Sequence, residues 1–360
     1  MQQLVSLVVL LVFVWTTAIF NFPLYADQNS KVPTPEIQTA TALVQKGQTR
    51  EAISNLEKAV KDYPNDVEAR NFLANLYLSQ NEHSKAEQTY RKAIDMDPKN
   101  AQAYNNLGIL YLKKGEAKKA MESFRTAIEK DPKLAEAHYN LGEAALLADK
   151  PKIAAQFFKK AFELNPKDPT IEPKLALALA QSGAIDEAIR HYEKVTRINP
   201  NDTQSTSDLG FAYLSKSKPE KASKEFLKVI AIHPDSTMAH YGLALSLKAV
   251  GKREDAIREF EKTYEISPKF IDAHIEAANL LIETGKTSEA KAEYETVTKL
   301  YGEIFSKNKG NDQARLRFSK ILMKFGDQKE AKDNLKKVMN SQGPNTELHM
   351  EAKALMESLK

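Results

Sequence analysis

Residues 101–134 read AQAYNNLGILYLKKGEAKKAMESFRTAIEKDPKL, and this stretch decides the fold because close variants of it recur along the chain. It holds two helix-forming segments separated by Gly115, and it ends at Asp131-Pro132. Glycine suits the left-handed turn that ends one helix, and proline cannot continue the next. The stretch therefore predicts a helix, a tight turn, a second helix and a second turn.

The same features return at a constant interval in both directions from this stretch. Prolines mark the interval at Pro64, Pro98, Pro132, Pro166, Pro200, Pro234 and Pro268. Alanines follow it independently at Ala52, Ala86, Ala120, Ala154, Ala188, Ala222, Ala256 and Ala290. On the same helix as each alanine, one turn later, stands a large side chain, at Leu56, Tyr90, Phe124, Phe158, Tyr192, Phe226, Phe260 and Tyr294. Residues one turn apart stack on one helix face, so a repeated helical packing surface is predicted.

The tight turn inside each unit has its own recurring residue. It is a glycine at Gly47, Gly115, Gly183, Gly251 and Gly285, and Asn81, Asp149 or Ser217 at the equivalent places. In the first helix a leucine precedes a small residue, as in Leu73-Ala74 and Leu107-Gly108, which allows two helix backbones to approach closely. The recurring glycine, or its Asn, Asp or Ser replacement, predicts a residue with left-handed backbone conformation at the end of each first helix.

This pattern resembles the tetratricopeptide repeat over Pro33 to Ile304. The resemblance implies an all-α chain, an α-solenoid in which helix-turn-helix hairpins form a right-handed superhelix. Its eight units are 33–66, 67–100, 101–134, 135–168, 169–202, 203–236, 237–270 and 271–304, the last with Gly302 in place of the proline. We expect an insertion at 305–311, a divergent ninth unit at 312–345 and a C-terminal capping helix at 346–360.

The N-terminal segment 1–26 carries no charged side chain, and residues 4–20 read LVSLVVLLVFVWTTAIF. Such a segment is typical of a membrane anchor or of a signal peptide. Leu24-Tyr25-Ala26 offers an imperfect cleavage site after Ala26, so both alternatives stay open, and residues 27–32 form a linker. We expect the repeats to be exported or membrane-anchored, outside the cytoplasm, as in a bacterial periplasm.

Chemistry is sparse in this sequence. The absence of cysteine excludes disulfides and thiolate ligands, and a net charge of +4 does not favour a nucleic-acid partner. His138, His240 and His274 stand at equivalent places of their units, which indicates packing between helices rather than metal binding. No glycine-rich phosphate loop or nucleophile elbow is present. We expect no enzyme activity, metal, cofactor, nucleic acid or small-molecule substrate.

In the tetratricopeptide family the first helix of each hairpin lines a concave groove. The resemblance places on it Asn71, Asn75, Leu78, Gln102, Asn105, Asn106, Ile109, Leu112, Glu136, Tyr139, Asn140 and Glu143, and, in later units, Phe211, Leu214, Met238, Tyr241 and Leu245. Amides both donate to and accept from a peptide backbone, so the first set suits an extended segment. The second set would anchor an amphipathic helix, or pack against a neighbouring turn of the superhelix.

The function expected from these observations is that of a protein–protein interaction scaffold of the cell envelope, reaching the membrane through residues 4–20 unless these are cleaved. Two alternatives stay open: a peptide-binding co-chaperone for exported clients, and a regulatory subunit of an envelope enzyme or polysaccharide export complex. Residues 299–337 are rich in lysine and arginine. They form either a solvated helix face or a contact for an acidic partner or anionic lipid.

Overall fold

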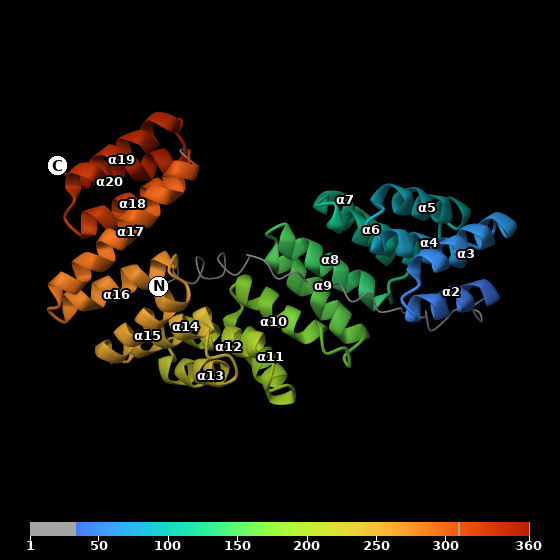
Figure 1. Cartoon of the computed structure of the whole chain (residues 1–360), viewed down its shortest axis with the longest axis horizontal. Helices are drawn as coiled ribbons and strands as arrows, with labels where there is room; N and C mark the ends of the chain where they lie inside the picture. Colours follow the sequence, from blue (N-terminus) through green and yellow to red (C-terminus); the bar gives the residue numbers. More distant parts are fainter. Residues whose placement is uncertain (1–33, 309, 360) are drawn as a thin grey trace. The chain divides into compact units, whose positions relative to one another are not determined.

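The structure, a computed structural model, describes residues 34–308 and 310–359 (Figure 1). These residues form 19 α-helices, α2 to α20, and no strand, which confirms the prediction of an all-α chain. Within these ranges no helix combines the length and the apolar character needed to cross a bilayer. The apolar segment 1–26 and the linker 27–32 lie outside the described residues.

The chain divides into two compact units, one ending at Lys216 and the other beginning at Ser217. The first unit contains α2 (Pro35–Gln45), α3 (Thr49–Asp62), α4 (Val67–Ser79), α5 (His83–Met96), α6 (Ala101–Lys113), α7 (Ala117–Lys130), α8 (Ala135–Leu147), α9 (Pro151–Leu164), α10 (Ile171–Gln181), α11 (Ile185–Ile198) and α12 (Thr203–Ser215). Consecutive helices from α2 to α11 pair into five hairpins, and each hairpin packs on the next.

The hairpin core consists of the small and large residues that recur in the sequence. Ala120 and Phe124 of α7 and Ala154 and Phe158 of α9 are fully buried. A Cβ atom placed on Gly108 of α6 would lie 2.5 Å from Cε1 of Phe124, far inside normal contact distance. The glycine is therefore required because the aromatic ring packs directly against the α6 backbone.

Turns within and between hairpins follow the sequence signals. Gly47, Gly115 and Gly183 have φ between 75° and 90°, and Asn81 and Asp149 adopt φ of 60° and 54°. This confirms the predicted left-handed residues at the ends of the first helices. Each later first helix begins after an inter-hairpin turn, where residues such as Asn100 act as caps: its side chain accepts from the Ala103 N–H at 2.9 Å.

The second unit contains α13 (Pro219–Ile232), α14 (Thr237–Ala249), α15 (Arg253–Ile266), α16 (Ile271–Glu283), α17 (Thr287–Lys307), α18 (Asp312–Lys324), α19 (Gln328–Ser341) and α20 (Glu347–Ser358). The insertion expected at 305–311 begins inside α17, which reaches 21 residues. Gly302 replaces the proline that stops the other second helices, so this helix continues. Phe305 in the added turn packs against Tyr301 and Phe318, and α20 packs on α18 and α19.

Candidate binding face on the first helices

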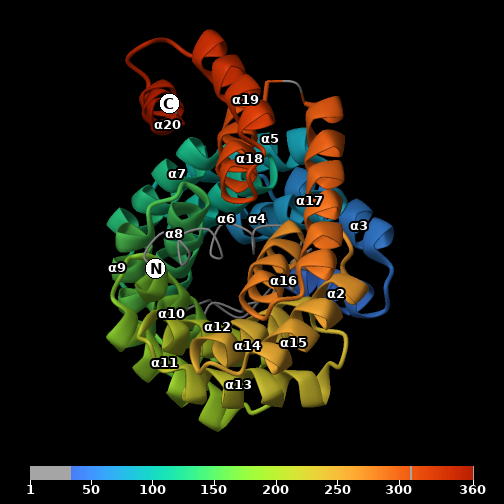
Figure 2. The same cartoon turned by 90° about the vertical axis from the view of Figure 1, so that its left-hand side faces the viewer.

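The first helices of the first unit share one side of the structure. Figure 2 shows α6, α8 and α10 on one side of the hairpin layer and α7, α9 and α11 on the other. Neighbouring first helices also contact each other directly, α4 with α6 and α6 with α8. Side chains of α6 and α8 that point away from the second helices therefore meet on a common surface, which we call the α6–α8 face.

Five polar residues of the α6–α8 face form one hydrogen-bonded network. Asn140 Nδ2 donates to Asn105 Oδ1 at 2.9 Å, and Asn105 Nδ2 donates to Glu136 Oε1 at 3.0 Å. Gln102 Nε2 donates to Glu136 Oε2 at 3.3 Å and to Asn106 Oδ1 at 3.1 Å. The structure brings these five residues together across two hairpins, but it buries Asn105, Asn106 and Asn140, which the resemblance placed on an open groove.

Glu136 is the only acidic member of this network. Burial raises the pKa of its carboxyl group, and hydrogen bonds from Gln102, Asn105 and Asn140 act in the opposite direction. In residues 34–308 and 310–359, no lysine, arginine or histidine forms an ion pair with it. The network therefore holds a carboxylate by neutral amides alone.

The remaining residues of the α6–α8 face follow the helical period of α8. Tyr139, Glu143 and Leu147 are spaced so that they extend the surface that begins at Glu136. The Tyr139 ring packs edge-on against Phe158 with centroids 5.4 Å apart, and Glu143 Oε2 accepts from Lys174 Nζ of α10 at 3.2 Å. Leu147 is 56% exposed. This end of the face is thus mixed, with an aromatic ring, an ion pair and an accessible aliphatic side chain.

The predicted residues of α4 lie deeper than the resemblance implied. Leu78 is fully buried and offers no surface. Asn75 Oδ1 accepts a short hydrogen bond from the buried Tyr90 hydroxyl of α5, so this amide joins the two helices of one hairpin. Asn71 is 9% exposed, and its Oδ1 has no hydrogen-bond partner.

The apolar candidates do not form a single surface within either unit. Ile109 of α6 is buried, and Leu112 is half-buried against the hairpin core. Phe211 and Leu214 are half-buried in α12 of the first unit. Met238, Tyr241 and Leu245 lie on α14 of the second unit, where Tyr241 is 2% exposed and packs against Phe260 and Phe270. Their role in binding an amphipathic helix stays a prediction.

Asp208 on α12 is a half-buried carboxyl group that no sequence pattern singles out. Gln204 Nε2 donates to its Oδ1 at 3.1 Å, and the Tyr192 hydroxyl donates to its Oδ2 at 3.5 Å. Burial is the main cause that raises the pKa of Asp208 to about 6. The sequence of α12 carries no signal for this group, because the raised pKa depends on the packing around Asp208 in the folded protein.

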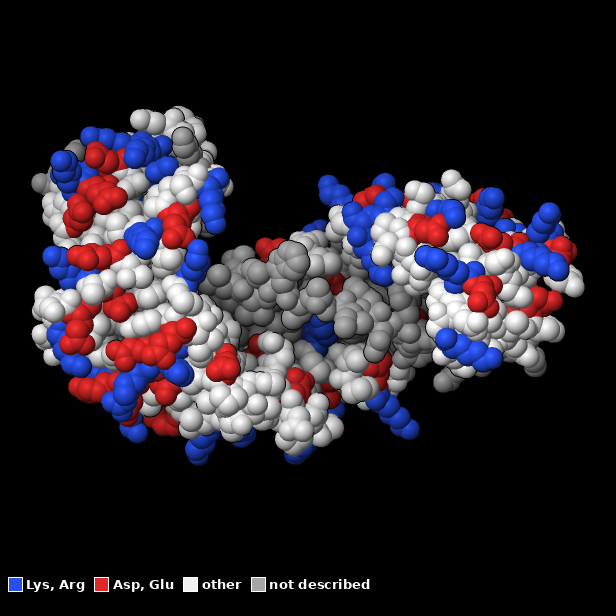
Figure 3. All heavy atoms as spheres, in the orientation of Figure 1, with Lys and Arg blue, Asp and Glu red and all other residues white. Residues whose placement is uncertain are grey.

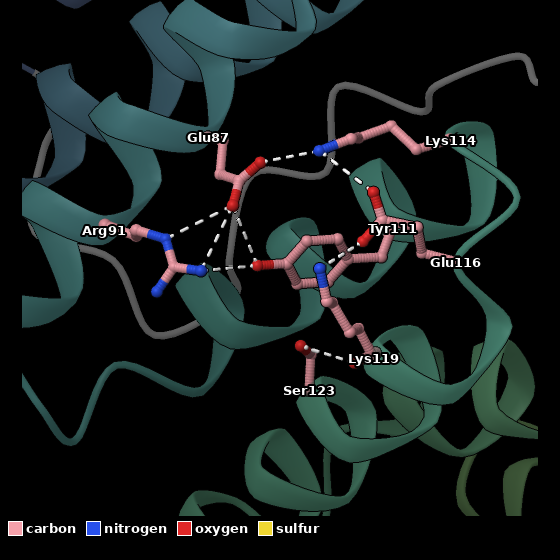
Figure 4. Close-up of polar contacts among 7 residues, drawn as sticks. All are labelled: Glu87, Arg91, Tyr111, Lys114, Glu116, Lys119 and Ser123. Carbon is pink, nitrogen blue, oxygen red and sulfur yellow. Dashed lines mark hydrogen bonds and ion pairs between the residues drawn. The ribbon is translucent and has the colours of Figure 1, made fainter.

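A second polar cluster joins α5, the C-terminal end of α6 and α7 in the first unit (Figure 4). Glu87 accepts from Lys114 at 2.8 Å and from the Tyr111 hydroxyl and Arg91 at 3.1 Å each. The hydrogen bond from Lys114 is the main cause that lowers the pKa of Glu87 to about 2. Every charged group of this cluster has a counter-charge, so it fastens two hairpins and leaves little for a ligand.

The recurring histidines serve the packing of the repeats. Nε2 of His240 lies 2.8 Å from the Pro234 carbonyl oxygen, and Nδ1 lies 2.7 Å from a Glu259 carboxylate oxygen. His274 repeats this arrangement one hairpin later, with Pro268 and Glu293. His138 keeps only the bond to the Pro132 carbonyl. Across the described residues, no three histidine, aspartate or glutamate side chains gather as a metal site.

The basic stretch 299–337 is partly neutralised in the second unit. Arg317 pairs with Asp272, Lys320 Nζ lies 2.5 Å from Glu351, and Arg315 donates to the Asn334 amide oxygen at 3.2 Å. In the view of Figure 3, acidic and basic side chains are interspersed over the surface of this unit. These contacts favour a solvated helix face over a dedicated anionic-ligand surface.

Stacked helical hairpins with this residue pattern define the class of tetratricopeptide proteins. Residues 247–299 match a model of the tetratricopeptide repeat, and residues 36–270, more than half of the chain, match the model described as the cilia and flagella-associated protein 70 C-terminal domain. The chain belongs to this family of tetratricopeptide domains. A comparison with curated proteins gave no significant match.

Solved structures share the fold. The C-terminal part of a tetratricopeptide repeat protein from Cytophaga hutchinsonii is 19% identical, covers 67% of this chain and 96% of its own, and has a TM-score of 0.53. PilF of Pseudomonas aeruginosa is 24% identical, covers 57% and 93%, and has a TM-score of 0.50. YrrB, described as a tetratricopeptide protein with an unusual peptide-binding site, is 30% identical, covers 51% of this chain and 95% of its own, and has a TM-score of 0.48.

The fold places the protein in a general functional class. Tetratricopeptide proteins bind protein or peptide partners, and the fold is typically not catalytic. Protein binding is therefore the function that the fold indicates for this chain.

Proposed function

We propose that this protein is a non-catalytic scaffold whose α6–α8 face holds an extended segment of a partner protein. The observation that carries the proposal is the network of four amides and one carboxylate on that face. An extended segment brings one unpaired N–H and one C=O per residue. Asn105 is fully buried and Asn106 and Asn140 are nearly so, so the half-buried Gln102 and Glu136 are the members of the network that can bond this backbone. Tyr139 and Leu147 next to the network supply apolar contact area.

The location of the scaffold is part of the proposal. The uncharged sequence of residues 4–20 supports a scaffold held at, or exported across, a membrane, with the repeats in the cell envelope. A co-chaperone for exported clients would use the same face for many unfolded segments. A regulatory subunit of an envelope enzyme or polysaccharide export complex would use it for one.

Purification of the tagged full chain from solubilised membranes of its source cells tests the proposal. Leu147→Ser changes an exposed residue of the α6–α8 face, and Ile198→Ser is a matched control at the end of α11, where the side chain is 69% exposed. Because both side chains are accessible, neither substitution should unfold the protein. We expect Leu147→Ser to reduce the yield of the partner several-fold and Ile198→Ser to leave it unchanged.

The composition of the bound material separates the alternatives. One stoichiometric partner supports the scaffold or the regulatory subunit, and an associated enzyme activity supports the latter. Many unfolded clients support the co-chaperone. Equal yields from both variants and the wild type would contradict binding at the α6–α8 face.

A further inference from the structure

Two carboxylates of the α6–α8 face, those of Glu136 and Glu143, are not fully used as hydrogen-bond acceptors. Glu136 accepts only from neutral amides, and the described part of the chain provides no cation beside it. On the same helix, Glu143 uses one carboxylate oxygen for Lys174, while its Oε1 is buried and without a partner. Both carboxylates thus retain capacity to accept hydrogen bonds from a bound molecule.

Asn71 adds a buried acceptor one hairpin earlier. Asn105 occupies the equivalent place in the next hairpin and directs its amide to Glu136 of the neighbouring first helix. By the same geometry Asn71 of α4 faces the adjoining helix α6, which carries Gln102 and Asn106. Its side chain is nine-tenths buried, yet Oδ1 receives no hydrogen bond. Buried polar atoms are nearly always satisfied, so this atom indicates a missing donor.

The missing component must supply N–H donors and positive charge. Burial disfavours the charged form of the Glu136 carboxyl group and raises its pKa, and no cation in the described residues offsets this cost. Guanidinium and ammonium groups carry only donors and are cationic. The Tyr139 ring, one helical turn from Glu136, adds an aromatic group of the kind that accommodates such cations.

We propose that Glu136 is the receptor for a basic side chain, arginine or lysine, in the extended segment that binds the α6–α8 face. Asn71 Oδ1 and Glu143 Oε1 are enclosed in the free chain, so they accept further N–H groups of the same segment only after the side chains around them shift. An acidic segment would bring carboxylates next to Glu136 and Glu143, and the Lys174 ammonium group beside them is already paired. This inference rests on the proposed function, and it specifies the chemistry of the partner.

Selection from a random peptide library displayed on phage tests the proposal with the full chain as bait. The wild type, Glu136→Gln and Glu129→Gln are used in parallel, because Glu129 is an exposed residue of α7 and its substitution removes the same charge. We expect arginine and lysine to be enriched several-fold in peptides selected by the wild type and by Glu129→Gln. The enrichment should disappear with Glu136→Gln.

A change in the peptide gives a second test that needs no protein variant. In a selected peptide, the enriched arginine is replaced by citrulline, which keeps the shape and removes the charge. We expect binding to the wild type, measured by fluorescence anisotropy, to weaken at least tenfold. Glu136→Gln, checked for folding by circular dichroism, should bind both peptides with similar affinity.

The outcomes separate this inference from the proposed function. Selected peptides whose binding is weakened by Leu147→Ser, but which are not enriched in arginine or lysine, would overturn this inference and still support binding at the α6–α8 face. An equal affinity for the arginine and citrulline peptides would also overturn it. If no selected peptide depended on the α6–α8 face, the proposed function itself would fail.

Discussion

A methyl group added at Gly108 tests how closely the helices of a hairpin must approach. In Gly108→Ala the new Cβ would lie 2.5 Å from Cε1, 2.7 Å from Cδ1 and 2.9 Å from Cζ of Phe124. Normal contacts between carbon atoms begin at about 3.5 Å. The Phe124 ring is fully buried, so it cannot swing into solvent to relieve the overlap.

Two opposing effects determine the magnitude. Alanine is favoured over glycine in a helix interior by about 1 kcal/mol. Overpacking a well-filled core costs about 1–3 kcal/mol. Because three ring atoms overlap with the added methyl group, we expect the upper part of that range and a net loss of about 1–2 kcal/mol of stability.

Hydrogen exchange of α6 and α7 amides is the appropriate assay, because repeat arrays can open locally instead of unfolding in one step. Gly108→Ala should accelerate exchange in this hairpin. Adding Phe124→Leu should remove most of the penalty, since the first hairpin already combines Ala40 with Leu56, both fully buried. Unchanged or slower exchange in Gly108→Ala, or no rescue by Phe124→Leu, would refute the packing argument.

Three further predictions concern polar groups of the first unit. The pKa of Glu87 falls from 4.5 to about 2 on folding, so its contribution to stability is complete above about pH 4.5 and is lost as the pH falls from 4.5 to 2. Thermal melts should show that Glu87→Gln loses less stability in acid than the wild type, and an equal loss would contradict this. The pKa of Asp208 rises from 3.8 to about 6 on folding, so the protein loses stability as the pH increases from 3.8 to 6. In urea titrations Asp208→Asn should therefore stabilise the protein above pH 6 by at most about 3 kcal/mol, with no gain below pH 3.8. Tyr90→Phe leaves the Asn75 oxygen without its donor and should cost about 1–3 kcal/mol, whereas Tyr63→Phe at an exposed site should have no effect on the same urea titrations.

The fold could be predicted from the sequence because the repeats specify it locally. The constant spacing of the prolines, the glycines with positive φ such as Gly115, and the alternation of Ala120 with Phe124 each describe one hairpin. Eight copies of the same local pattern leave little ambiguity about the architecture. The main departure from the regular helix lengths is the extension of α17 to 21 residues, and Gly302, which stands where other units have proline, indicates it in the sequence.

The state of the individual binding residues could not be predicted, because it depends on contacts between hairpins. Asn140 and Asn105 belong to successive hairpins and engage each other, so the amides predicted as free peptide-binding groups are partly used within the protein. Leu78 points into the core, and Asp208 gains its raised pKa from burial between α12 and the preceding helix, where Tyr192 contacts it. Helical spacing identifies the face of a helix, but it does not give the partner of each side chain.

Site-specific photo-crosslinking in source cells shows whether a partner protein occupies the α6–α8 face. A photoreactive phenylalanine analogue replaces Tyr139 on the α6–α8 face, or Arg125, an exposed residue of α7 on the opposite side. A partner bound on the α6–α8 face should form a covalent adduct with position 139, through one continuous segment, and none with position 125. Adducts from position 125 alone, or equal adducts from both positions, would contradict it.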